Sequence, residues 1–290
     1  MGTPHVPFLG LEVLWFQSGG TLCNLRCTHC FISCAPDNHN FALMSRADLR
    51  RTLDEVRDKG VKEIYHTGGE PFINREMPEI LDDCLALADT IVLTNATLIK
   101  PALAARLCEI RDSHPGRSLN FRVSLESWDL AKNDEIRGAG VFDRALLGAK
   151  YLSDEGFRPI FTMMRWWDSK NDDSFHVQKF EDLIHSRSIL NGHVKILPSL
   201  RLGEEIRRSR GYRPDERLTE ACVENYDFRN LQCSSCRMVT NKGVFVCPIL
   251  LDFPEARMGD DLEETFRPFP LTFQACYTCR IAGLCCGNSA

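Results

Sequence analysis

The sequence predicts an α/β fold in which parallel strands alternate with helices, followed by a small cysteine-rich region. Short strand-like segments alternate with amphipathic helical segments from about residue 9 to residue 200. This alternation gives six β/α units, which is too few for a closed eight-fold barrel. The alternation stops near Arg201, and cysteines become dense after Tyr212. We therefore expect two domains, residues 1–205 and residues 206–290.

Each predicted strand is a short apolar run, and helical segments between the runs carry apolar residues at helical spacing. Ser45 precedes the first helix and is followed three residues later by Asp48, which resembles a capping box. Gly60 marks the expected end of that helix. The predicted strands are Leu11–Gln17, Glu63–His66, Thr90–Thr94, Asn120–Ser124, Pro159–Met164 and His193–Leu197.

The composition is that of an ordinary globular protein, with 43% hydrophobic and 26% charged residues. A formal net charge of −5 argues against nucleic acid as the main partner, because phosphate binding needs a basic face. No run approaches the roughly 20 apolar residues that span a bilayer. The segment Val6–Phe16 lacks the basic start of a signal peptide. With 14 cysteines in ligand-like clusters, we expect a cytoplasmic monomer that does not bind membranes.

The most informative stretch is a CxxxCxxC run formed by Cys23, Cys27 and Cys30. Three thiolates on one loop suit three irons of a 4Fe–4S cluster and leave the fourth iron open. The alternatives are a zinc site and three buried thiols. Structural zinc favours paired Cys-x2-Cys or Cys/His sets, so the run favours a cluster while leaving zinc open.

A second informative stretch reads Thr67-Gly68-Gly69-Glu70-Pro71 and follows a predicted strand. CxxxCxxC followed further along the chain by Gly-Gly-Glu-Pro resembles the radical S-adenosylmethionine (SAM) superfamily. The resemblance implies a partial (β/α)6 TIM-like barrel. It also implies that the open iron chelates SAM, which is cleaved to methionine and a 5′-deoxyadenosyl radical that abstracts a hydrogen atom. A flavodoxin- or ferredoxin-type protein would then be the electron donor.

The same resemblance implies which residues bind SAM near the first two strands. Ligands of a parallel sheet sit at the carboxyl ends of its strands, and the motif lies at such an end. Gly68, Gly69 and Glu70 would hold the methionine ammonium group, and Pro71 would stiffen the turn. His29 occupies a position where the family usually has an aromatic residue that packs on the adenine.

Further SAM contacts are implied around the third and fourth strands. Ser124 would contact the carboxylate or ribose of SAM, and Arg137 would pair with the carboxylate, which suits the fork of an arginine. Glu126 departs from the family, which often has Ser-Leu-Asp where this chain has Ser-Leu-Glu. Asn95 follows the third strand and is either a ligand contact or a turn residue.

The cysteines of the C-terminal region resemble the SPASM/twitch extension of radical SAM enzymes, which binds one or two auxiliary 4Fe–4S clusters. Cys233 is an alternative ligand to Cys236, and Cys285 and Cys286 leave a second auxiliary cluster open. A zinc ribbon is the alternative to a cluster. The ligands implied for one auxiliary cluster are Cys236, Cys247, Cys276 and Cys279.

A cysteine that binds no iron could donate a hydrogen atom to a substrate radical. A structural role is the alternative for each candidate. The candidates are Cys34, Cys222, Cys285 and Cys286.

The compact size and cysteine-rich tail most resemble radical SAM enzymes that act on aminocyclitols and aminoglycosides. We therefore expect an oxidoreductase or epimerase of secondary metabolism, such as antibiotic biosynthesis, with a small sugar-like substrate. The alternative is epimerisation or crosslinking of a ribosomally made peptide. An iron–sulfur electron carrier and a zinc module are the non-enzymatic alternatives.

Overall fold

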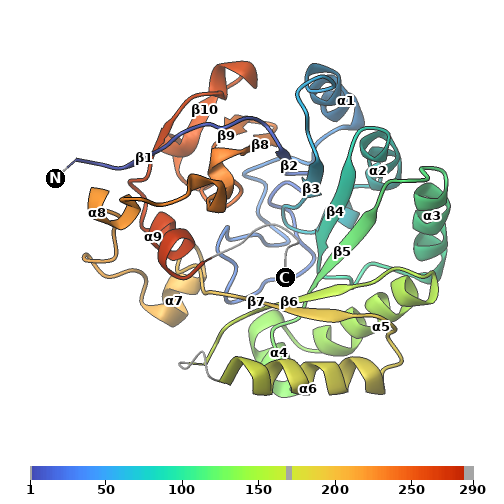
Figure 1. The fold of residues 1–290 in the computed structure, drawn as a ribbon. Coiled ribbons are helices and arrows are strands. Elements are labelled where there is room, and N and C mark those ends of the chain that lie inside the picture. The colour runs from blue at the N-terminus through green and yellow to red at the C-terminus, as the bar shows by residue number, and fades with distance from the viewer. Residues whose placement is uncertain (1, 168–171, 284–290) are drawn as a thin grey trace.

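The computed structural model describes residues 2–167 and 172–283, and a curved sheet forms the centre of this part (Figure 1). Its nine described strands are hydrogen-bonded in the order β10-β9-β8-β2-β3-β4-β5-β6-β7. The seven strands from β8 to β7 in this order run parallel to one another. The strands of the barrel are β2 (Val13–Phe16), β3 (Glu63–His66), β4 (Asp89–Thr94), β5 (Leu119–Ser124), β6 (Ile160–Met164) and β7 (His193–Leu197).

Helices cover the convex side of the sheet, and the cysteine loop lies on its concave side (Figure 1). Ser45 caps the first helix by accepting a hydrogen bond from the backbone N–H of Asp48, as its sequence predicts. The helices of the barrel are α1 (Arg46–Glu55), α2 (Met77–Leu85), α3 (Pro101–Asp112), α4 (Leu130–Arg137), α5 (Val141–Asp154) and α6 (Asp173–Ser186).

Strand β5 shows how the two faces of the sheet are assigned. Side chains alternate across a strand, so every second residue faces the helices. Phe121 and Val123 belong to the apolar core between the sheet and the helices. The side chains of Arg122 and Ser124 point to the opposite face of the sheet, where they line a cavity on the concave side. The alternation therefore places polar groups inside the barrel.

The prediction of a partial α/β barrel is confirmed, and all six predicted strands are present. Their ends differ from the prediction by at most two residues at either terminus. Helix α4 is an addition, because sequence analysis predicted no element for its segment. It ends at Arg137, which is 7% exposed and packs inside the protein. The stretch after Arg201 also contains a short helix, α7 (Glu205–Ser209).

The C-terminal region continues the central sheet beyond β2, and the division into residues 1–205 and 206–290 stays a prediction. Strand β8 (Cys236–Thr240) pairs in parallel with β2, and β9 (Gly243–Phe245) pairs with β8 in antiparallel fashion. Strand β10 (Arg257–Gly259) forms the edge beyond β9. Backbone hydrogen bonds thus join the regions on both sides of the predicted boundary. The remaining strands and α-helices are β1 (His5–Val6), α8 (Glu220–Val223), β11 (Phe269–Pro270) and α9 (Gln274–Ile281).

Arg237 of β8 holds this region together from within. Its side chain is 1% exposed. Its guanidinium donates to the carbonyl oxygens of Thr265 at 2.6 Å, Cys233 at 3.1 Å and Arg267 at 3.2 Å. The same group lies over the ring of Phe8 at 4.3 Å, which is a cation–π contact. One buried cation therefore connects several segments that lie apart in the sequence.

We predict that Arg237→Met destabilises the protein, because it removes these hydrogen bonds and leaves buried carbonyl groups without a partner. The expected loss in the free energy of unfolding is about 2–4 kcal/mol, since bonds to a charged group are stronger than neutral ones. Urea unfolding monitored by circular dichroism measures this loss. Arg229→Met is the matched control, because Arg229 is 80% exposed and should change little. Equal stability of the two variants would contradict the anchoring role.

Candidate functional site

The CxxxCxxC run lies on the loop that follows β2, at the carboxyl end of the parallel strands. Cys23 and Cys27 are buried at 8% and 9% exposure, and Cys30 is half-buried. The three cysteines line a cavity of about 170 Å³ together with Gly68 and Gly69. The two motifs are separated in the sequence, and the structure brings them together as the resemblance implies.

The glycines of the second motif allow its backbone to touch the cysteine loop. The N–H of Gly69 donates to the carbonyl oxygen of Gly20 at 3.0 Å, and the N–H of Glu70 donates to that of Leu22 at 3.1 Å. A Cβ atom on Gly69 would lie 2.0 Å from the Leu22 oxygen, which leaves no room for a side chain. Gly68 adopts a φ of 132°, in a region that favours glycine.

Glu70 is fully buried, and its carboxylate is bonded within the protein. It accepts hydrogen bonds from the Thr94 hydroxyl at 2.7 Å, the Asn95 N–H at 2.7 Å and the Phe72 N–H at 3.2 Å. Burial raises the pKa of this carboxyl to about 7, although these donors oppose the shift. Glu70 therefore ties its loop to the end of β4. Pro71 begins the short 3₁₀ helix Pro71–Ile73, consistent with the expected stiffening role.

Two polar side chains approach the sulfur atoms of the run. Asn95 lies 3.9 Å from the Cys23 sulfur through its Nδ2, and Arg137 lies 4.0 Å from the Cys27 sulfur through its Nη1. Donors near a ligand sulfur stabilise its thiolate form and tune a bound cluster. Asn95 is therefore a buried neighbour of the cysteine loop, and it also donates to Asn24 at 2.9 Å.

The thiols of the run have unequal proton affinities in the protein alone. Burial raises the pKa of Cys23 to about 12 and that of Cys27 to about 11. A hydrogen bond from the Cys34 side chain lowers the pKa of Cys30 to about 6. Among the described residues, no three Cys, His, Asp or Glu side chains form a ready site for a single metal ion. In a 4Fe–4S cluster, each thiolate binds a different iron atom, and three soft donors on one loop fit that group.

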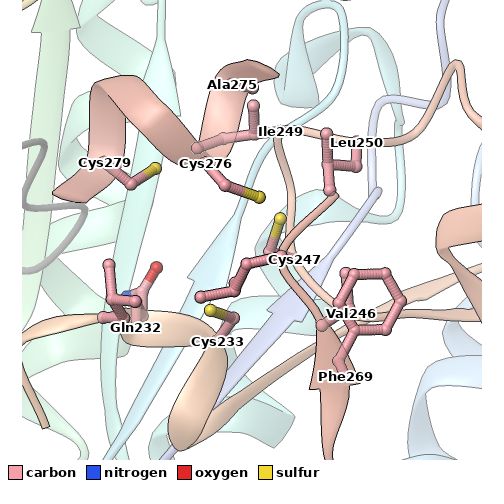
Figure 2. A pocket seen from close by; sticks show the side chains of 12 residues that line it. Gln232, Cys233, Val246, Cys247, Ile249, Leu250, Phe269, Ala275, Cys276 and Cys279 are labelled. Atoms are coloured by element: carbon pink, nitrogen blue, oxygen red, sulfur yellow. The ribbon is translucent and has the colours of Figure 1, made fainter. Parts of the chain in front are cut away.

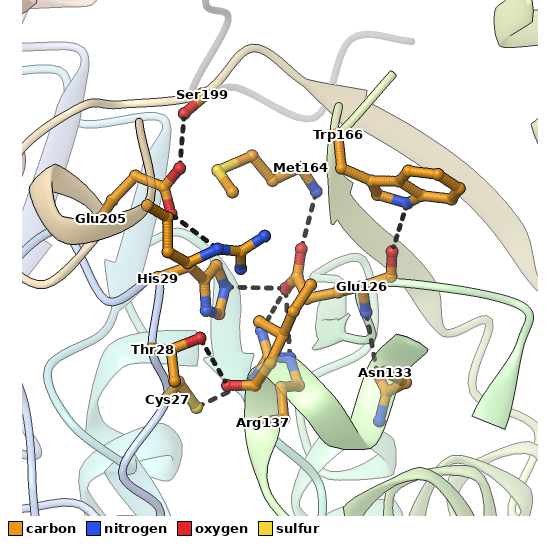
Figure 3. A network of polar contacts seen from close by, with 12 residues as sticks. Cys27, Thr28, His29, Glu126, Asn133, Arg137, Met164, Trp166, Ser199 and Glu205 are labelled. Carbon is orange, nitrogen blue, oxygen red and sulfur yellow. Dashed lines mark hydrogen bonds and ion pairs between the residues drawn. The ribbon is translucent and has the colours of Figure 1, made fainter. Parts of the chain in front are cut away.

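Glu126 is the centre of a polar network beside this loop (Figure 3). Its Oε1 accepts hydrogen bonds from His29 Nε2 at 3.0 Å and from Arg137 Nη2 at 2.5 Å. Its Oε2 accepts from the backbone N–H of Met164 at 2.9 Å. Burial opposes ionisation, but the charges of His29 and Arg137 hold the pKa of Glu126 well below its usual range. The network joins the cysteine loop to α4 and β6.

Two expected SAM contacts are therefore bonded to each other through Glu126. His29 turns its ring toward this carboxylate, and Arg137 forms a buried ion pair with it. Ser124 lines the cavity over the cysteine loop and also a second cavity inside the barrel, so it lies where the two cavities meet.

A second cavity of about 170 Å³ extends from the cysteine loop into the barrel. It shares His29, Ser124 and Arg137 with the first cavity. Sequence analysis did not single out Arg122 or Thr162, which also line it. The alternation of side chains along β5 and β6 could have identified them, because it places both residues on the inward face of the sheet with polar neighbours.

The candidate hydrogen donors fall in different places. Cys34 is 5% exposed and lines the first cavity, and its N–H donates to the Cys30 sulfur at 3.2 Å. Cys222 is half-buried in α8, where its sulfur lies 3.4 Å from the Thr219 hydroxyl. Cys285 and Cys286 lie outside the described residues.

A second cysteine cluster lies in the C-terminal region (Figure 2). The sulfur atoms of Cys276 and Cys279, from α9, face those of Cys233 and Cys247 across one cavity. The remaining lining is largely apolar and includes Ile249. Four thiols converge there, which is the number that closes a 4Fe–4S cluster.

The structure places Cys233 in this cavity, whereas the sequence-based ligand set preferred Cys236. Cys236 is fully buried within β8, and its sulfur lies 3.6 Å from the carbonyl oxygen of Val246. Cys236 is not among the residues that line the cavity. Cys233 precedes the strand, so it can turn toward them.

These features define a class of protein: a partial α/β barrel with a cysteine-rich loop at the carboxyl ends of its strands. The family model of the radical SAM superfamily matches residues 18–176, more than half of the chain. The chain therefore belongs to the radical SAM superfamily, whose cofactors are a 4Fe–4S cluster and SAM.

Curated relatives match part of the barrel region. The antilisterial bacteriocin subtilosin biosynthesis protein AlbA of Bacillus subtilis is 32% identical over 136 residues, or 46% of this chain and 29% of that protein. The Fe-coproporphyrin III synthase of Methanosarcina barkeri is 31% identical over 138 residues, or 47% and 33% of the two chains. The matched region thus spans about a third of each relative.

Solved structures share the fold over most of the chain. Streptococcus suis SuiB bound to the precursor peptide SuiA gives a TM-score of 0.65 at 18% identity, covering 89% of this chain and 65% of that one. The protein anSMEcpe with bound AdoMet and the Cp18Cys peptide gives a TM-score of 0.59 at 15% identity, covering 88% and 80%. At these identities the likeness concerns the fold. Within the described part of this chain, no helix has the length and apolar character needed to cross a membrane.

We predict that Gly69→Ala separates the two loops, because the new Cβ would overlap the Leu22 carbonyl group. The affinity of the reconstituted protein for SAM should fall at least roughly tenfold, equivalent to about 1.4 kcal/mol. Equilibrium binding of radiolabelled SAM measures the change. Gly259→Ala is the control, since the nearest atom to its Cβ would be 3.6 Å away. Unchanged affinity in Gly69→Ala would refute the requirement for this close contact.

Proposed function

We propose that this protein is a radical SAM enzyme that modifies a ribosomally made peptide. The observation that carries the proposal is the junction of two cavities, one over the cysteine loop and one inside the barrel. Ser124 and Arg137 line both, so a group in the barrel would lie next to a ligand held over the loop.

The size of the inner cavity supports a peptide side chain as the group that enters it. Its volume is about 170 Å³, whereas pockets for drug-sized molecules measure roughly 300–1,000 Å³. Among the similar proteins, AlbA is a bacteriocin biosynthesis protein, and the structures of SuiB and anSMEcpe contain bound peptides. The expected sugar-like substrate has less support, because it rested on chain size and the cysteine-rich tail alone.

The protein's own residues would bind and orient the reactants. Cys23, Cys27 and Cys30 would hold the cluster, while Asn95 and Arg137 would donate toward their sulfurs. When bound, the cluster and SAM supply reductive cleavage and hydrogen-atom abstraction. A flavodoxin- or ferredoxin-type donor would supply the electron.

The second motif and the Glu126 network would place SAM over the loop. Gly68 and Gly69 present their backbone to the first cavity. Glu70 would act by holding that backbone in place, since its oxygens already accept three hydrogen bonds. Glu126 would fix the directions of His29 and Arg137 beside the bound SAM.

We further propose one auxiliary 4Fe–4S cluster in the C-terminal region, as the resemblance to the SPASM/twitch extension implies. Four cysteines meet in one largely apolar cavity, and such a cavity limits access of water to a cluster (Figure 2). The proposed ligands are Cys233, Cys247, Cys276 and Cys279.

We predict that Cys233→Ser lowers the iron content of the anaerobically reconstituted protein by roughly four irons, the content of one cluster. Cys236→Ser should retain that iron, because Cys236 lies in β8 and does not line the cavity in which the four thiols meet. Colorimetric iron and sulfide assays measure both variants. Loss of iron in Cys236→Ser with retention in Cys233→Ser would reverse the assignment.

The reaction class is tested by assaying 5′-deoxyadenosine after reduction in the presence of SAM. We expect a pool of short peptides encoded near this protein's gene to stimulate its formation, while aminoglycosides do not. The triple substitution of Cys23, Cys27 and Cys30 by Ala is the control and should abolish formation of 5′-deoxyadenosine. Stimulation by aminoglycosides alone would restore the sugar-like substrate as the better proposal.

A further inference from the structure

The cavity in which the C-terminal thiols meet contains one further polar side chain. Apart from the four cysteines, its described lining is apolar except for Gln232. Gln232 directly precedes Cys233 and begins the short 3₁₀ helix Gln232–Ser234. Its carboxamide lies on the same side of the cavity as Cys233 and points into the space that the four sulfur atoms surround (Figure 2). A carboxamide in such an apolar cavity needs a hydrogen-bond partner.

The protein itself does not supply that partner. The Oε1 atom of Gln232 is buried and makes no hydrogen bond with any described residue. The backbone carbonyl oxygen of Gln232 does accept from the N–H of Ser235 at 2.9 Å, so the unpaired group belongs to the side chain alone. Burying a polar group costs free energy unless it is hydrogen-bonded, and a glutamine kept only for packing normally bonds to the surrounding chain. The unpaired amide therefore points to a ligand in the cavity.

A 4Fe–4S cluster bound by the four thiolates would supply the missing partner. Its sulfur atoms accept hydrogen bonds, and these bonds are among the features that set the reduction potential of a cluster. The two ends of a carboxamide have nearly the same shape, so a half-turn about the last side-chain bond brings the NH2 group to the place of Oε1. The amide can thus donate to a cluster sulfur without any movement of the backbone.

The other strong donor near this cavity has different partners. The Arg237 guanidinium donates to the carbonyl oxygens of Thr265, Cys233 and Arg267. Arg237 is also not among the residues that line the cavity. Gln232 is therefore the one lining side chain of the described part of the chain, other than the thiols, that can donate to a ligand there.

We infer that Gln232 donates a hydrogen bond to the auxiliary cluster and raises its reduction potential. This inference rests on the proposed auxiliary cluster and assigns a tuning residue to it. Reduction adds one electron, and therefore negative charge, to the cluster. A donor stabilises the more negative form more strongly, and the apolar cavity increases this electrostatic effect. Gln232 does not bind iron; it makes the cluster easier to reduce.

A redox titration of the auxiliary cluster tests this inference. The triple substitution of Cys23, Cys27 and Cys30 by Ala removes the ligands of the first cluster, so the reconstituted full chain reports the auxiliary cluster alone. It is titrated anaerobically with dithionite and redox mediators, and electron paramagnetic resonance measures the reduced cluster. On this background, Gln232→Met should lower the ratio of reduced to oxidised cluster at a fixed potential roughly tenfold, which equals about 59 mV for a one-electron couple.

A second measurement separates a hydrogen bond from a general change in polarity. In D2O, electron–nuclear double resonance detects exchangeable deuterons near the reduced cluster, and Gln232→Met should lose one such coupling. Gln274→Met is the matched control, because Gln274 belongs to α9, does not line the cavity and donates to the Arg213 carbonyl oxygen at 2.7 Å. It should change neither the potential nor the couplings. If Gln232→Met does not retain iron, Gln232→Leu takes its place.

Three results would overturn the inference: an unchanged potential in Gln232→Met, an unchanged set of deuteron couplings, or loss of the auxiliary iron in both Gln232 variants. The last result would make Gln232 a requirement for cluster binding. Failure of the proposed cluster gives a different result, because the triple variant itself would then contain no iron and the inference would fall with the cluster. If the triple variant binds about four irons whose potential does not depend on Gln232, the cluster stands and the inference is wrong.

Discussion

The close contact between two backbone loops is the constraint on which the candidate site depends. Gly69 and Glu70 donate to carbonyl groups of the loop that carries the cysteines, and Gly69 has no space for a side chain. The contact is possible because β2 and β3 are parallel neighbours, so both loops leave the sheet at the same edge. Any change that separated these strands would also separate the proposed cluster ligands from the residues proposed to hold SAM.

The buried charges extend this arrangement across the barrel. Glu126 connects the cysteine loop with α4 and β6, so the position of Arg137 depends on three segments at once. A buried ion pair contributes little net stability once desolvation is included, but removing one partner is strongly destabilising. We therefore interpret the pair as a device that fixes geometry. Arg122 of β5 is buried and lines the same cavity.

The C-terminal region depends on the barrel for its shape. Strand β8 extends the parallel sheet through β2, and Arg237 connects the loops around it by hydrogen bonds to their carbonyl groups. This arrangement buries Cys236 in the strand and leaves Cys233 facing Cys247 and α9. The proposed auxiliary cluster would thus be attached directly to the sheet that carries the main site.

The sequence by itself determined the six strands of the barrel, the cysteine loop and the Gly-Gly-Glu-Pro turn, because these depend on local patterns. Hydrophobic alternation marks strands, and a motif keeps its spacing whatever surrounds it. Only the tertiary structure placed Cys233 in one cavity with Cys247 and α9, showed the hydrogen bonds of Glu70 within the protein, and placed Arg122 in the wall of the barrel interior. Those outcomes follow from strand pairing and side-chain direction, which involve residues far apart in the chain and leave no local signal.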